Sequence, residues 1–260
     1  MVAFVAQSRL VYSALFYWLY PWGYVSNVVL APFFQLLTFS LVATYATGAE
    51  SAQRYMVGMI TWAIVWIVIS GILQSFAYDR GFGTLSLLFA TPVSRLGALA
   101  SRAALHFPNG VISALVTIAL AALFADLDVS SLDWGTAAAA VVMMSLACTT
   151  LGLVLGCWTA LTQDWFVSNA TSHALLITLT GVLVPTADLP PIASDVGVLL
   201  PLTHGVEALR QAFVGASIAD VRGELVREGV VALAYGVGSY VAFRLLERHA
   251  RRSGALELAG

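Results

Sequence analysis

Long stretches without a charged residue limit what this chain can fold into. A helix that spans a bilayer needs about 20 apolar residues. A charge at mid-bilayer costs about 2.5–3.5 kcal/mol on insertion scales, whereas a Leu, Ile, Val or Phe gains only about 0.3–0.6 kcal/mol. The charges therefore mark helix ends, and the sequence predicts an all-α membrane protein with six transmembrane helices. Charge-free runs lie between Arg9 and Glu50, Arg54 and Asp79, Arg102 and Asp126, Asp133 and Asp164, Asp164 and Asp188, and Glu228 and Arg244.

The amino-acid composition agrees with a membrane environment. Hydrophobic residues make up 60% of the chain and charged residues 10%, against about half and about a quarter in a typical soluble domain. The net charge is −2, so nucleic acid is not an expected partner, because binding DNA or RNA calls for a basic surface. Membrane lipid is the expected surrounding.

We expect one transmembrane domain over residues 1–260. Aromatic residues crowd its start, and such side chains gather at membrane interfaces, so residues 1–23 are predicted to form a cytosolic interfacial helix. A proline-rich stretch at 185–228 is predicted to be an external re-entrant or interfacial pair of short helices, and 247–260 a basic cytosolic tail. The predicted spans are about 25–46, 55–78, 103–125, 134–161, 165–184 and 229–246.

Arginine counts predict the orientation. With the N-terminus inside, eight arginines fall in inside segments and four in outside segments, as the positive-inside rule favours. Both termini are therefore predicted to be cytosolic.

All twelve basic residues are arginine. A GxxxxGK[ST] phosphate-binding loop needs a lysine, so ATP would have to be bound by another polypeptide. The four histidines form no His-x-x-x-His pair, and we expect neither a catalytic group nor a metal or cofactor site in this chain.

Polar side chains within the spans are candidates for a polar-lined path. Asn169 and His173 lie in span five, where an ionisable residue indicates function by default. A neutral histidine bonded to a neighbouring helix is the alternative. In span one, the candidates for the translocation path are Phe33, Phe34, Gln35 and Phe39.

Glycines four residues apart predict a close helix contact. Gly152 and Gly156 form a small-xxx-small pattern, which indicates close approach without saying whether the neighbour belongs to the same chain. Gly236 and Gly238 favour the same interpretation.

Two polar motifs stand out. Residues 79–102 form a basic island between spans two and three, in which Asp79-Arg80-Gly81 leads through Gly83-Thr84-Leu85 to Thr91-Pro92-Val93-Ser94-Arg95. The second motif is Leu200-Pro201-Leu202-Thr203-His204-Gly205-Val206-Glu207-Ala208-Leu209-Arg210.

With these motifs and six spans, nearly the whole chain resembles the membrane subunit of type 2 ABC exporters, a family that includes drug, polysaccharide and teichoic-acid exporters. Ser86 stands where the family usually has Glu, and a serine cannot make the charge contact of that Glu.

The resemblance implies a permease without its own ATPase site. Its partners would be two cytosolic ABC ATPase subunits, which carry the ATP and Mg²⁺, and a second permease subunit, either a copy of this chain or a related one. Helices would swing between inward and outward states by rigid-body movement. Abundant Ala, Gly and Arg without Lys favour a bacterial cell (plasma) membrane.

The resemblance also assigns residue roles. The ATPase coupling surface would comprise Asp79, Arg80, Thr84, Leu85, Leu88, Pro92 and Arg95. The external gate would comprise Pro185, Pro201, Glu207 and Arg210, and the last two are hypothesised to form an ion pair or a cap, because residues three apart share a helix face.

Two other classes of protein compete with the exporter subunit. A lipid-modifying membrane enzyme would need converging catalytic groups; the external Asp126, Asp128 and Asp133 are candidates, but no basic or His-rich segment is predicted opposite them. A passive channel would leave the coupling island unexplained. The apolar, aromatic first span suits an amphipathic or lipidic cargo.

Overall fold

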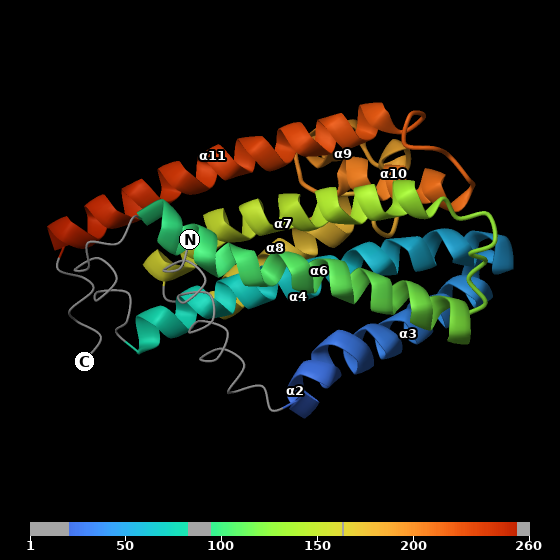
Figure 1. Cartoon of the computed structure of the whole chain (residues 1–260), viewed down its shortest axis with the longest axis horizontal. Coiled ribbons are helices and arrows are strands. Elements are labelled where there is room, and N and C mark those ends of the chain that lie inside the picture. The colour runs from blue at the N-terminus through green and yellow to red at the C-terminus, as the bar shows by residue number, and fades with distance from the viewer. Residues whose placement is uncertain (1–20, 83–94, 163, 254–260) are drawn as a thin grey trace.

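The computed structural model describes residues 21–82, 95–162 and 164–253, and the regular elements in these ranges are helices (Figure 1). The predicted all-α class is therefore confirmed. The described elements are α2 (Pro21–Val25), the π-helical turn η1 (Ser26–Leu30), α3 (Ala31–Thr47), α4 (Ala49–Gly81), α6 (Arg95–Phe124), α7 (Trp134–Thr162), α8 (Trp165–Leu179), the 3₁₀ turn η2 (Thr186–Asp188), α9 (Pro191–Val198), α10 (Thr203–Phe213) and α11 (Arg222–Ser253).

Five helical stretches are long and apolar enough to cross a membrane. Four of them, in α4, α6, α7 and α11, include the spans predicted there to within a residue or so. In the described part of the chain, the five stretches are Trp22–Ala46, Gln53–Gly81, Ala103–Phe124, Trp134–Thr162 and Arg222–Arg248.

The first span begins earlier than predicted. The interfacial helix was expected to end at residue 23, yet Pro21 and Gly23 open α2, which continues through η1 into α3. Pro32 has no N–H to bond the carbonyl four residues back. The wider turn of η1 precedes it, in which the Ala31 N–H bonds the Ser26 carbonyl. The rest of the predicted 1–23 helix lies outside the described residues.

Span five is shorter than predicted. It was expected to reach residue 184, but α8 ends at Leu179. Gly181 has a φ of +80°, which ends the helix. The 15 residues of α8 measure about 22 Å at about 1.5 Å per residue, less than the roughly 30 Å of a bilayer core. The span five prediction was therefore wrong at its C-terminal end.

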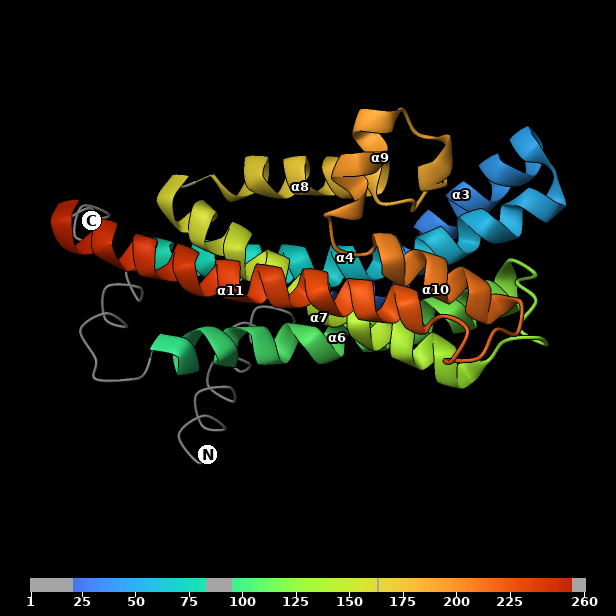
Figure 2. The same cartoon turned by 90° about the horizontal axis from the view of Figure 1, so that it is seen from above.

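Helix α4 is the centre of the bundle. It contacts α3, α6, α7, α8 and α10. In an apolar stretch of 18 residues, 78% are buried in α4, compared with 17% in the first span and 22% in α11. Ile64, Ile69, Ile72 and Phe76 are fully buried along it. Helices α3 and α11 are therefore the outer members, as their positions in Figures 1 and 2 also show.

Glycines explain how closely α7 approaches α4. A Cβ built on Gly156 would lie 2.5 Å from Phe76, and one on Gly152 would lie 2.9 Å from Ile72. The neighbour of this glycine pair is thus in the same chain. A Cβ on Gly236 or Gly238 would meet α7 side chains only at 3.6 and 3.8 Å, which is ordinary contact. Helix α11 therefore packs closely against α7 at this second pair, as expected, but the packing leaves room for a small side chain there.

Helices α9 and α10 form a bent pair between α8 and α11. Their axes differ by 88°, so together they are either one broken span or a re-entrant segment. The predicted pair of short helices in 185–228 is thus present. They lie at the end of the bundle where α11 begins, opposite the C-terminal ends of α4 and α11 (Figure 1).

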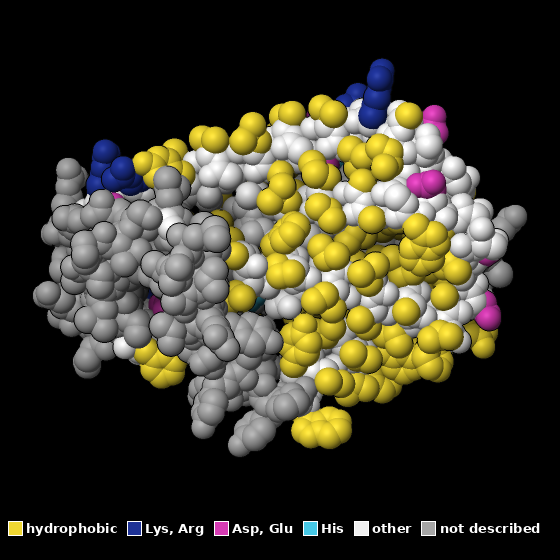
Figure 3. All heavy atoms as spheres, viewed as in Figure 1, with side chains coloured by type: hydrophobic (Ala, Val, Ile, Leu, Met, Phe, Trp, Pro, Cys, Tyr) yellow, Lys and Arg dark blue, Asp and Glu magenta, His cyan; other side chains and the backbone are white. Residues whose placement is uncertain are grey.

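The surface follows the same division. Hydrophobic side chains cover much of the face drawn in Figure 3, and charged side chains gather near the two ends of the bundle. Apolar flanks with charged ends are the surface that a membrane-spanning bundle requires.

Candidate functional site

Helix α8 turns its polar side toward the protein. Ser168, Ser172 and His173 are buried, whereas Phe166 and Val167 are 68% and 56% exposed. This arrangement is the reverse of a helix on a water-soluble protein. It places a polar surface against α4, inside the bundle, and an apolar surface outside.

A small polar and aromatic cluster lies between α8 and α4. The Ser70 hydroxyl donates to Asn169 Oδ1 at 3.0 Å and lies 3.4 Å from His173 Nε2. The rings of Trp62 and Trp66 meet the imidazole edge-on, with centroids 5.1 and 5.5 Å away. The predicted path residues Asn169 and His173 therefore both contact the same helix, α4.

The tautomer of His173 follows from its contacts. Nδ1 lies 2.8 Å from the carbonyl oxygen of Asn169, which can only accept, so Nδ1 carries the proton. Nε2 faces the Ser70 hydroxyl, whose single proton is donated to Asn169 Oδ1.

Sequence reasoning missed the α4 half of this cluster. Trp62, Trp66 and Ser70 are spaced by four residues and therefore share one helix face. That spacing was a usable signal. What it could not provide was the identity of the helix that α4 faces there.

The remaining predicted path residues lie elsewhere. Phe33 of α3 contacts Phe124 of α6, with ring centroids 5.1 Å apart. Phe34 is 61% exposed, Gln35 is half-buried, and Phe39 packs against the core. Helix α3, which carries these candidates, packs against α4 and α6, whereas Asn169 and His173 contact α4 from α8.

The Pro-Leu-Thr-His motif fixes the bend between α9 and α10. Leu202 has a φ of +85°, an uncommon value for a residue with a side chain. Thr203 donates its hydroxyl to the Gly197 carbonyl at 2.6 Å. A Cβ on Gly205 would lie 2.1 Å from Met144, so only glycine lets α10 approach α7 this closely. Pro201 is buried in the same turn.

Glu228 of α11 holds this bend from outside the motif. Its carboxylate accepts hydrogen bonds from the backbone N–H groups of Leu202, at 2.7 Å, and Gly205, at 3.1 Å, and it is fully buried. Beside it, His204 Nδ1 lies 2.7 Å from Glu224 Oε2. Sequence reasoning treated Glu228 only as a span boundary, since nothing in the sequence links it to a turn more than twenty residues away.

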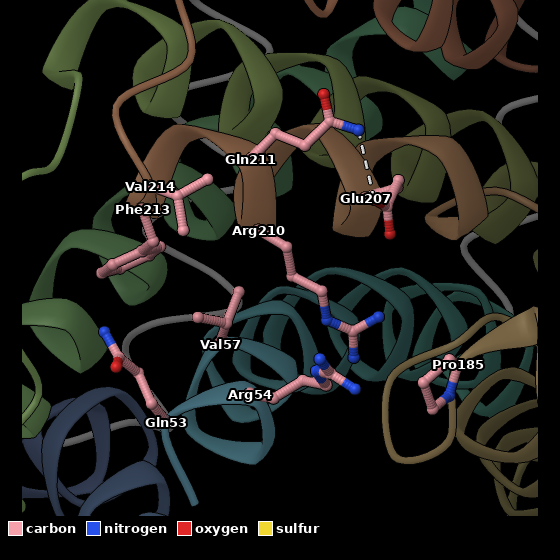
Figure 4. Close-up of a pocket in the computed structure, with 9 residues that line it drawn as sticks. All are labelled: Gln53, Arg54, Val57, Pro185, Glu207, Arg210, Gln211, Phe213 and Val214. Atoms are coloured by element: carbon pink, nitrogen blue, oxygen red, sulfur yellow. Dashed lines mark hydrogen bonds between the residues drawn. The ribbon is translucent and has the colours of Figure 1, made fainter. Parts of the chain in front are cut away.

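Glu207 and Arg210 do not form the hypothesised ion pair in the described structure. Arg210 donates from one Nη atom to the carbonyls of Gly181, at 2.6 Å, and Val182, at 3.5 Å. The Glu207 carboxylate instead accepts from the Gln211 amide at 3.1 Å (Figure 4). Arg210 therefore supplies partners to the irregular backbone after α8, which has no helical hydrogen bonds of its own.

Pro185, Glu207 and Arg210 share one pocket. It has a volume of about 470 Å³ and lies between α10, the start of α4 and the chain at Pro185. Three of the four predicted gate residues are thus brought together.

The coupling island is only partly described. Thr84, Leu85, Leu88 and Pro92 lie outside the described residues. Asp79 and Arg80 end α4 and Arg95 begins α6 at the same end of the bundle. The Arg80 guanidinium donates to the carbonyls of Ala160 and Leu161 in the last turn of α7. Arg80 therefore caps a neighbouring helix, a role that the sequence did not predict.

The acidic loop before α7 serves local structure. Asp128 Oδ1 accepts from the Ser130 N–H and Asp133 Oδ1 from the Thr136 N–H. Hydrogen bonds from Ser130 lower the pKa of Asp128, and chiefly the Thr136 N–H lowers that of Asp133. Within the described ranges, no three His, Cys, Asp or Glu residues are grouped so that they could hold a metal ion.

Long apolar helices with exposed apolar flanks define a multi-pass helical membrane protein. A family model described as ABC-2 type transporter matches residues 5–214, which is most of the chain. The chain therefore belongs to the ABC-2 type transporter family, whose membrane domain is the permease component and works with an ABC ATPase. No curated protein sequence matches the chain significantly.

Proposed function

We propose that this protein is the permease subunit of an ATP-driven exporter that moves an amphipathic or lipid-linked substrate, such as a drug, glycolipid or polysaccharide, out of a bacterial cell. Two cytosolic ABC ATPases and a second permease subunit would complete the transporter. Membership of the ABC-2 family supports the permease class. The observation that carries the transport role is the inverted polarity of α8, whose polar side faces α4.

In this proposal the α4–α8 contact is part of the path. Trp62, Trp66 and His173 offer aromatic surface, and Ser70 and Asn169 offer hydrogen bonds. Such a surface suits a cargo that is part apolar and part polar. The residues Phe33, Phe34, Gln35 and Phe39 of α3 would contribute a second, more apolar wall.

The coupling surface would be the connection between α4 and α6. Asp79, Arg80, Thr84, Leu85, Leu88, Pro92 and Arg95 are its proposed members. Arginines at this end of the bundle support a cytosolic placement, with both termini inside. Because Arg80 also caps α7, a push on this connection would reach the turn between α7 and α8 directly.

Affinity purification from the native membrane tests the proposal. We expect a stoichiometric soluble ABC ATPase to co-purify with the detergent-solubilised wild-type chain. Arg95→Glu should reduce the amount recovered, whereas the matched charge reversal Arg222→Glu, at the other end of the bundle, should not.

The possible outcomes separate the claims. If no ATPase co-purifies while the wild-type protein stays folded, the exporter proposal is overturned. If both variants retain the ATPase equally, the permease assignment stands and the placement of the coupling surface is wrong.

A further inference from the structure

The pocket beside Pro185 contains two arginines whose charges are not balanced within it. Arg54 comes from the start of α4 and Arg210 from α10, and Figure 4 shows their guanidinium groups facing one another. Like charges held this close repel each other, the more so where water is partly excluded. An arrangement of this kind calls for an anion between or beside the two groups.

Both arginines have N–H donors without a hydrogen-bond partner among the described residues. Among the described residues, Arg54 makes no hydrogen bond or ion pair, and it is exposed to the pocket. Arg210 bonds two backbone carbonyls through one nitrogen, which leaves its charge in place, and its buried Nε atom has no partner there.

Glu207 is the acid that lines this pocket, and its single charge offsets only one of the two arginines. Its carboxylate accepts from Gln211 (Figure 4) and acts on Arg210 through its charge, without forming an ion pair with either arginine in the described structure. The lining therefore holds two positive charges and one negative charge. The pocket is electropositive on the side formed by Arg54 and Arg210.

We propose that this pocket binds a phosphate group, either on a lipid head group or as a free phosphate. One guanidinium fork satisfies a carboxylate, whereas two forks that converge match the additional oxygens of a phosphate. Val57, Pro185 and Val214 add apolar walls beside the arginines, and the volume of about 470 Å³ exceeds what a bare phosphate fills. A head group with the first part of its chain fits this combination.

The inference does not depend on the exporter function, because binding is measured on the isolated permease without an ATPase. Two probes distinguish the two sources of phosphate. One is inorganic phosphate, and the other is a short-chain phosphatidylglycerol below its micelle concentration. Calorimetric titration of the full chain in a neutral detergent gives the affinity of each.

Three variants test the role of the charges. Arg54→Gln should weaken binding by about tenfold or more, as expected for the loss of hydrogen bonds between charged groups. Glu207→Gln should tighten binding, because it removes the negative charge of the lining. The matched control is Arg222→Gln, which removes an exposed arginine at the same end of the bundle but outside the pocket and should leave binding unchanged.

Binding of phosphatidylglycerol alone identifies a lipid head group as the ligand, and binding of both probes shows that free phosphate suffices. Arg54 is exposed and forms no bond in the described structure, so its substitution should not impair folding. The proposal is overturned if neither probe binds the wild-type chain, or if Arg54→Gln binds as tightly as Arg222→Gln.

Discussion

Glu228 offers the sharpest test of how the bent α9–α10 pair is held. Its carboxylate accepts from the buried N–H groups of Leu202 and Gly205, at 2.7 and 3.1 Å. Replacing it by alanine leaves both donors without a partner. An unsatisfied buried group costs about 1–3 kcal/mol, so Glu228→Ala should lower the free energy of unfolding by about 2–6 kcal/mol.

The conservative variant separates the loss of charge from the loss of acceptors. Glu228→Gln keeps one acceptor oxygen and should cost about half as much, because one donor remains bonded. At about 2–4 °C per kcal/mol, the alanine variant should melt roughly 4–24 °C below wild type. Glu207→Ala is the matched control, since that residue lies on α10 but is exposed, and its melting temperature should barely change.

Amide hydrogen exchange localises the effect. In Glu228→Ala, the amides of Leu202 and Gly205 should exchange at least about thirtyfold faster, which corresponds to the lower bound of 2 kcal/mol. Exchange in α7 should change less. Wild-type exchange at both amides, together with a wild-type melting temperature, would refute the claim that Glu228 fixes this bend.

Two further predictions concern how α7 is held. Gly156→Ala should destabilise the protein by about 1–3 kcal/mol, because its Cβ would lie 2.5 Å from the buried ring of Phe76. Gly236→Ala, with its nearest contact at 3.6 Å, should be neutral or slightly stabilising. Equal melting temperatures for the two variants would contradict the packing argument. Arg80→Ala should speed amide exchange in the last turn of α7, where the carbonyl of Ala160 loses its donor. Unchanged exchange there, with ATPase binding lost, would mean that Arg80 acts on the partner and not on α7.

The sequence alone determined the class of fold. Runs without charge predicted the spans, and the structure places α4 and α7 where their flanking charges indicated. The physical reason is that lipid offers backbone groups no hydrogen bonds, so an apolar run of this length must be helical. The same reasoning failed for α8, because Gly181 ends that helix within an apolar stretch that carries no charge as a signal.

The sequence also indicated which residues are special without indicating their partners. The Pro-Leu-Thr-His motif and Arg210 stood out in the sequence. Only the fold shows that Glu228 accepts hydrogen bonds from the backbone of the motif and that Arg210 donates to backbone carbonyls. Gly156 predicted a close contact, and only the fold identifies Phe76 as its neighbour.

Apolar length and charge therefore determined that this chain spans a membrane as helices, since those properties act locally along the sequence. Tertiary structure decided which faces meet. The cluster around His173, the cap that Arg80 places on α7 and the facing pair of Arg54 and Arg210 all join residues about 80 to 160 positions apart. Contacts over such distances depend on the order in which helices pack, which no local pattern encodes.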